Sequence, residues 1–170
     1  MKRTPLVFFG LILWLASVAA TAQFSGMRFS SQQDPKHQEM EKRGDQGMGF
    51  QQGKTTHHFL LRKNGGAIEV TANSTDDKTS NEEIQMHLRH IEHAFQSGDF
   101  NIPMFVHDQT PPGVATMTKL KDQIHHKYEP AENGGRVVIS SANAEAVAAI
   151  HEFLKFQIQE HKTGDALEVK

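Results

Sequence analysis

The sequence predicts an α+β fold of two layers, in which duplicated ββα units form an antiparallel sheet covered by two main helices. The first observation is an internal repeat, because a His-His pair ahead of an Asn-Gly-Gly turn occurs in residues 57–66 and again in residues 125–135. The second is that each copy continues with an alternating apolar segment and then with a helical apolar period. A repeated unit with this order indicates the architecture of the whole domain.

Residues 1–22 have the pattern of a secretory signal peptide. Lys2 and Arg3 provide the positive start, residues 6–18 the apolar segment, and residues 20–22 the small side chains of a cleavage site. The apolar segment is shorter than the ~20 residues that a membrane-spanning helix needs. We therefore expect a periplasmic or secreted protein with no membrane span after signal cleavage.

Residues 23–53 lack a sustained apolar period and are rich in polar side chains, which predicts a flexible polar tail. The chain then predicts a single duplicated ββα domain in residues 54–165 and a short C-terminal tail in residues 166–170. The absence of cysteine excludes disulfides, thiolate metal ligands and a cysteine nucleophile. An exported domain of this composition must therefore be stabilised by its hydrophobic core.

The first copy begins with a strand in residues 55–61, where side chains alternate between two faces. The dipeptide Asn64-Gly65 is typical of a short hairpin turn, and residues 67–72 form the returning strand. Ser80 is the expected N-cap of a helix that ends at Gly98. The apolar stripe of this helix consists of Ile84, Leu88, Ile91 and Phe95.

The connection between the copies contains three short segments. Residues 102–107 predict a short strand, the Pro-Pro-Gly sequence of residues 111–113 predicts a break, and residues 116–122 predict one or two helical turns. The second copy then repeats the order of the first, with strands in residues 124–128 and 137–139 on either side of a second Asn-Gly-Gly turn.

Asn143 is expected to cap the second main helix, which ends near Gly164. Its apolar stripe consists of Val147, Ile150, Leu154 and Ile158. His151 lies within this stripe, because four residues along a helix return to about 40° from the starting direction. A buried imidazole without a hydrogen bond costs a few kcal/mol, so His151 is either satisfied by a neighbouring group or binds a ligand.

The eleven histidines, all of which follow the expected signal peptide, provide candidate metal ligands. Alternation along the predicted strands places His57 and His126 on the face toward the helices. If a pseudo-twofold axis relates the copies, His57, His126 and His151 converge and form a site for zinc or copper. The further candidate ligands are His87, His90, His107, His161 and Met104. The alternative for each histidine is a hydrogen-bonded core position or a polar surface.

A set of short motifs extends over the predicted domain: Gly49-Phe50, residues 54–59, Gly98-Asp99-Phe100, Pro103-Met104, Val106-His107-Asp108, residues 148–157, Glu160-His161 and Thr163-Gly164-Asp165. These motifs are similar to those of an uncharacterised family of small bacterial exported proteins. The resemblance covers about residues 48–165 and implies no established activity. Some family members carry the label aspartate carbamoyltransferase, which we reject because this chain lacks the Ser-x-Arg-Thr loop and has about half the length of that enzyme. Gln51 stands where the family pattern has an acidic residue.

Two classes of function remain. The first is an exported protein that binds copper or zinc through histidines; the second is an interaction or structural module of the cell envelope that holds no metal. Enzymatic activity ranks below both, because no phosphate loop, nucleophile elbow or other catalytic motif occurs. Nucleic acid is not an expected partner. The sequence has 18 Lys and Arg against 20 Asp and Glu, and its basic residues form no cluster.

Overall fold

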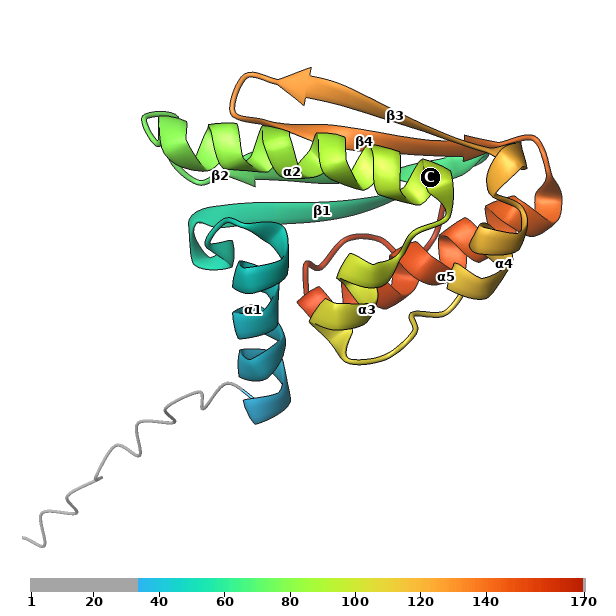
Figure 1. Ribbon diagram of the computed structural model, residues 1–170, viewed down its shortest axis with the longest axis horizontal. Helices are drawn as coiled ribbons and strands as arrows, with labels where there is room; N and C mark the ends of the chain where they lie inside the picture. The colour runs from blue at the N-terminus through green and yellow to red at the C-terminus, as the bar shows by residue number, and fades with distance from the viewer. Residues whose placement is uncertain (1–33, 170) are drawn as a thin grey trace, which may run out of the picture. The chain divides into compact units, whose positions relative to one another are not determined.

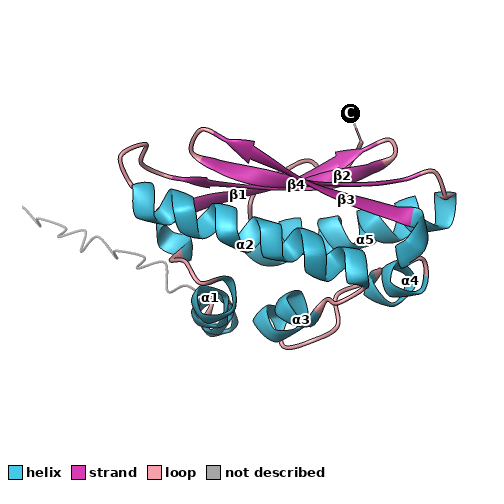
Figure 2. Cartoon of the chain, turned by 45° about the horizontal axis from the view of Figure 1, so that its top comes forward, coloured by secondary structure: helices cyan, strands magenta, loops and turns pink. Residues whose placement is uncertain are grey.

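The computed structural model describes residues 34–169, so the expected signal peptide in residues 1–22 lies outside the described part of the chain. A four-stranded antiparallel sheet has its helices on one side, which confirms the predicted α+β class (Figures 1 and 2). The elements are α1 (Pro35–Met48), η1 (Gln52–Lys54), β1 (Thr55–Arg62), β2 (Gly65–Ala72), α2 (Lys78–Ser97), α3 (Asn101–His107), α4 (Val114–Lys119), η2 (Lys121–Gln123), β3 (Ile124–Ala131), β4 (Gly134–Ser141) and α5 (Ala144–His161).

The strand order is β1-β2-β4-β3, so the hairpin of each expected copy pairs with the other through its second strand. Gly65 and Gly134 begin these two central strands, with φ values of +141° and +155°. A Cβ atom at Gly65 would meet the carbonyl oxygen of Ile139, and one at Gly134 would meet that of Val70. Both turns therefore need glycine, because the two hairpins approach each other closely there.

The two main helices cover the sheet in a crossed arrangement. Helix α2 follows the first hairpin but packs mainly on β3 and β4, whereas α5 follows the second hairpin and packs mainly on β1 and β2. Figure 2 shows α2 and α5 next to the sheet, with α1, α3 and α4 farther from it. The core between sheet and helices is apolar, with fully buried side chains that include Ile84, Val137, Ile150 and Phe153.

The helix ends partly follow the predicted signals. Asn143 caps α5 as expected, since its side chain accepts hydrogen bonds from the backbone N–H groups of Glu145 and Ala146. Ser80 is not the N-cap of α2. The cap is Asp77, whose Oδ1 accepts from the N–H of Ser80 at 3.0 Å. A carboxylate three residues earlier provides the stronger acceptor at a helix start.

Two segments differ from the predicted structure. Residues 102–107 are not a strand, because they lie in the short helix α3. The expected flexible tail contains α1, which starts at Pro35 after the N-cap Asp34. This helix buries little apart from Met40 and Gly44, so its sequence carries almost no apolar period to reveal it. No helix within residues 34–169 is long and apolar enough to cross a membrane.

Candidate functional site

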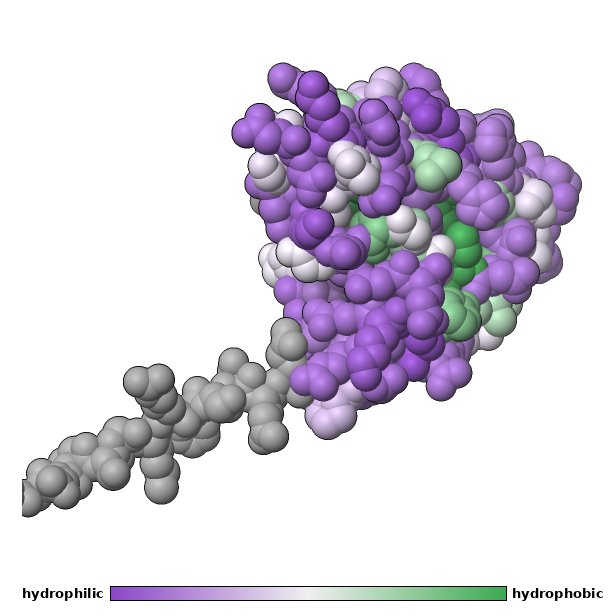
Figure 3. Space-filling view, turned by 60° about the vertical axis from the view of Figure 1, so that its left-hand side comes forward, coloured by the Kyte–Doolittle hydropathy of each residue, from purple (hydrophilic) through white to green (hydrophobic). Residues whose placement is uncertain are grey.

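A small cavity lies among the sheet, the two main helices and α3. Its volume is about 60 Å³, and most of its lining is apolar. On the side where α1 lies, the space-filling view shows hydrophobic residues gathered in a recess between hydrophilic regions (Figure 3). The polar residues that line the cavity come from four different elements; they are His57, His87, His107, Gln157 and His161. Among the described residues that line the cavity there is no Asp, Glu, Lys or Arg.

His161, the last residue of α5, lies between two other imidazoles. The ring centroids of His161 and His57 are 5.8 Å apart with the planes at 10°, and those of His161 and His107 are 5.1 Å apart with the planes at 83°. Phe50 lies against both His57, at 5.8 Å, and His87, at 5.4 Å. The fold therefore gathers histidines from β1, α3 and α5 at one end of the cavity.

The cavity histidines are held in their neutral form. Burial, followed by the neighbouring charge of His58, lowers the pKa of His57 to about 4. Burial likewise lowers the pKa of His87 to about 4, with smaller contributions from His57 and His90. Burial also lowers the pKa of His161 and that of His107. At neutral pH these imidazoles therefore carry no charge, and each has one nitrogen lone pair.

Three buried polar atoms at the cavity have no hydrogen-bond partner. They are Nε2 of His57, Nδ1 of His107 and Nε2 of Gln157. The other ring nitrogen of His107, Nε2, lies 2.9 Å from Oε1 of Gln157. Because a carbonyl oxygen only accepts, this bond places the hydrogen on Nε2 and leaves a lone pair on Nδ1. Buried polar atoms without partners are rare in folded proteins and call for a ligand, an ion or water.

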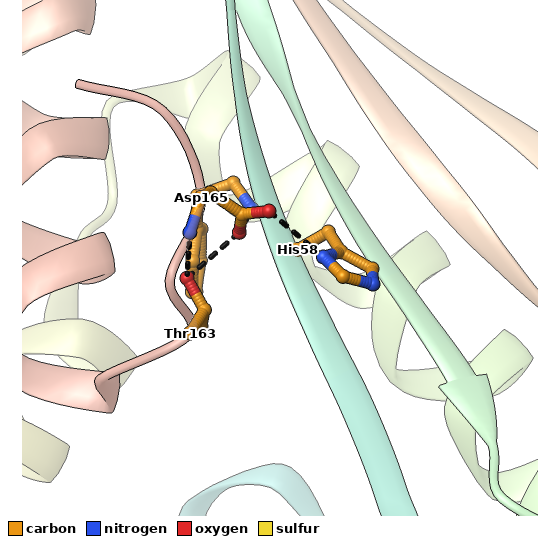
Figure 4. A network of polar contacts seen from close by, with 4 residues as sticks. His58, Thr163 and Asp165 are labelled. Atoms are coloured by element: carbon orange, nitrogen blue, oxygen red, sulfur yellow. Dashed lines mark hydrogen bonds and ion pairs between the residues drawn. The ribbon is translucent and has the colours of Figure 1, made fainter.

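Strand β1, which carries His57, is anchored by the residues that follow α5. Asp165 Oδ2 accepts the backbone N–H of Phe59 at 2.9 Å and the hydroxyl of Thr163 at 2.7 Å, while its Oδ1 lies 2.9 Å from Nδ1 of His58 (Figure 4). Desolvation raises the pKa of Asp165, but these hydrogen bonds outweigh it, so the net change is a lowered pKa. The anchor holds β1 against the chain just beyond His161.

The structure does not bring His57, His126 and His151 together. His126 faces α2 as expected, where Nδ1 lies 3.3 Å from Oε1 of Gln96 and burial lowers its pKa to about 4. His151 Nε2 lies 2.9 Å from the carbonyl oxygen of Arg62 and 3.0 Å from that of Gly65, at the β1–β2 turn. His57 lies on β1 and His126 on β3, the two opposite edge strands of the sheet, and His151 contacts the backbone of the β1–β2 turn.

The other candidate ligands also divide between the cavity and the surface. His87, His107 and His161 line the cavity, whereas His90 is exposed on α2. Met104 is 37% exposed on α3, although His107 one turn later is buried. In residues 34–169, no three His, Asp or Glu side chains are already arranged as a group that could hold a metal ion. Any ion in this cavity would therefore require side chains to turn.

Gln157 was not among the predicted site residues. Counted from the N-caps, Gln157 and His161 of α5 hold the same positions as Ile91 and Phe95 of α2, which are buried in the apolar core. A polar residue three positions after Leu154 in an apolar helical stripe was the available signal. The two main helices thus differ where α5 meets the cavity.

Comparisons with protein-family models, with curated proteins and with solved structures found no match.

Proposed function

We propose that this chain is an exported, non-catalytic protein that binds a transition metal ion, copper or zinc, through His57, His107 and His161. The observation that carries the proposal is the position of His161 between the two other rings, with unpaired nitrogens on both of them. All three ligands are among the candidates that the sequence offered. His107 and His161, which were further candidates there, take the places of His126 and His151 beside His57.

The spacing of the rings agrees with a shared ion. Imidazole nitrogens bind zinc at about 2.0–2.1 Å, so a ring centroid lies roughly 3.2 Å from the ion, and two such rings at tetrahedral or trigonal angles are about 5–5.5 Å apart. The centroid separation of His161 and His107, 5.1 Å, lies in this range, and that of His161 and His57, 5.8 Å, lies slightly above it. The nearly parallel planes of His57 and His161 do not yet aim both nitrogens at one point, so binding requires rotation of at least one ring.

The surroundings of His107 also support a ligand role. Metal-binding histidines usually donate the second ring N–H to an oxygen, which fixes the tautomer and the ring orientation. Gln157 supplies such an oxygen to Nε2 of His107, and the opposite nitrogen is left free. The apolar lining limits access of water to the three imidazoles. These features are those of a ligand with an orienting partner.

The difference between α2 and α5 at equivalent positions is the third observation that supports a metal site. Helix α2 has Ile91 and Phe95 where α5 has Gln157 and His161. Polar side chains in a buried stripe reduce stability unless they have partners, and such departures from an apolar core concentrate at functional sites. A ligand role explains why α5 carries them.

The test is metal uptake by the untagged mature chain, with Cu(I), Cu(II) and Zn(II) measured separately. We expect one ion per chain and a rise in melting temperature that follows ligand concentration over the dissociation constant. His57→Phe, His107→Leu and His161→Phe should each abolish stoichiometric uptake. The matched control is His90→Ala, which removes an exposed histidine from α2 and should leave uptake unchanged.

Two outcomes would contradict the proposal. Equal loss of uptake in the His90→Ala control would indicate adventitious binding by surface histidines. No uptake of any of the three ions would reject the metal site and favour the interaction module, for which the next measurement is capture of an envelope partner by the folded chain.

A further inference from the structure

A methionine thioether lies at the same cavity as the histidines. Met48 is the last residue of α1, lines the cavity, and packs partly buried against the core. Among the described residues that line the cavity, it is the one sulfur-containing side chain. The other methionines of the described chain lie elsewhere: Met40 and Met117 are buried outside the cavity lining, and Met86 and Met104 are exposed.

The local structure holds Met48 in this place. Helix α1 ends at Gly49, which has a left-handed φ of +76°, and the chain then turns so that Phe50 packs against His57. The guanidinium Nε of Arg43 donates to the carbonyl oxygen of Val106 at 2.9 Å, which ties α1 to α3 next to His107. These contacts of Phe50 and Arg43 hold the end of α1, and with it Met48, next to β1 and α3, which supply His57 and His107.

The charges at the cavity distinguish between the candidate ions. The lining supplies imidazoles and a thioether, all neutral, and contains no carboxylate among the described residues. The cost of transferring an ion into a low-dielectric interior rises with the square of its charge, so a divalent ion is penalised about fourfold more than a monovalent one. Thioethers are soft ligands that favour Cu(I), whereas zinc sites use imidazole, thiolate and carboxylate.

We propose that the ion is Cu(I) and that Met48 supplies a thioether ligand beside His57, His107 and His161. This inference rests on the proposed metal-binding function and names the ion for that site. It also gives α1 a role, because the helix carries the sulfur ligand to a site whose imidazoles come from β1, α3 and α5.

The experiment compares Met48→Leu with Met40→Leu, a matched control on the same helix whose side chain is buried away from the cavity. Affinities for Cu(I) and Zn(II) are measured by chelator competition under anaerobic conditions. We expect Met48→Leu to weaken Cu(I) binding at least tenfold and to change Zn(II) binding less than twofold. Met40→Leu should leave both affinities unchanged once circular dichroism has shown that it is folded.

X-ray absorption of the copper-loaded chain gives a second measurement that does not depend on affinity. Because the chain contains no cysteine, any sulfur bound to copper belongs to a methionine. A sulfur scatterer in the parent that is lost in Met48→Leu supports the inference. A nitrogen-only environment, or Cu(I) affinity that Met48→Leu leaves intact, overturns it while the histidine site stands. Failure of the parent to bind any ion rejects the proposed function itself.

Discussion

Nε2 of His107 lies 2.9 Å from Oε1 of Gln157, and this buried hydrogen bond joins α3 to α5 at the wall of the cavity. The two residues are far apart in the sequence, and each retains a buried nitrogen with no partner. The bond therefore orients His107 and leaves its Nδ1 without a hydrogen-bond partner.

The first prediction concerns Gln157. Gln157→Leu removes the oxygen that orients His107, so metal affinity should fall by about 10- to 100-fold, as is usual for loss of a residue that orients a ligand. Gln159→Leu is the control, because Gln159 is exposed on the same helix. Titration with a competing chelator measures both. An unchanged affinity in Gln157→Leu would show that His107 needs no orientation by the amide.

The second prediction is that His161→Phe, which removes a proposed metal ligand, makes the protein more stable. His161→Phe installs the residue that α2 has at the corresponding position, and the new ring packs against the apolar parts of the cavity. At pH 7 we expect the free energy of unfolding of the metal-free variant to exceed that of the parent chain by about 1 kcal/mol, which is typical of substitutions that stabilise a protein at the expense of its function. Urea unfolding measures the change. A clear destabilisation would mean that His161 makes a structural contribution that its contacts do not reveal.

The third prediction is that His151 stabilises the fold and does not bind the metal ion. Its Nε2 lies within hydrogen-bond distance of two carbonyl oxygens at the β1–β2 turn, so it holds α5 against that hairpin. His151→Leu keeps most of the volume but leaves buried acceptors unpaired, which should cost about 1–3 kcal/mol. Metal uptake should not change. A variant that keeps full stability but loses uptake would restore His151 to the ligand set.

The fourth prediction is a loss of stability in mild acid from His126. Burial, followed by the neighbouring charge of His125, lowers the pKa of His126 to about 4, whereas an unfolded histidine has a pKa near 6.5. Between these values the unfolded chain binds more protons than the folded chain. The contribution of His126 to stability is therefore intact above pH 6.5 and is lost as the pH falls toward 4.

A shift of this size corresponds to about 3 kcal/mol. His126→Leu should therefore lose about 2–2.5 kcal/mol less stability than the parent chain when urea unfolding at pH 7 is compared with unfolding near pH 4.5, because the full difference is reached only below pH 4. His93→Gln, which changes an exposed histidine of α2 that does not contribute to the pKa of His126, should behave like the parent. Equal losses in His126→Leu and the parent would contradict a buried neutral imidazole at position 126.

The local patterns predicted most of the fold. Alternating strands, Asn-Gly turns and the apolar stripe from Ile84 to Phe95 are short-range signals, and the structure has the predicted α+β arrangement of a sheet under two main helices. Helix α1 was not predicted because few of its side chains are buried, so its sequence has little apolar periodicity. Helix α3 was predicted as a strand because the apolar pattern of seven residues is too short to distinguish a helix from a strand.

The sequence by itself determined that the domain contains no thiol chemistry, that histidine is abundant, and that one histidine of each strand pair faces the helices. The tertiary structure alone decided which of these histidines meet. Helices α2 and α5 cross to the opposite hairpins, so His126 lies beneath α2 while His57 lies beside the end of α5. Convergence depends on which surfaces pack together over long sequence separations, and the local periods along a single chain do not encode that choice.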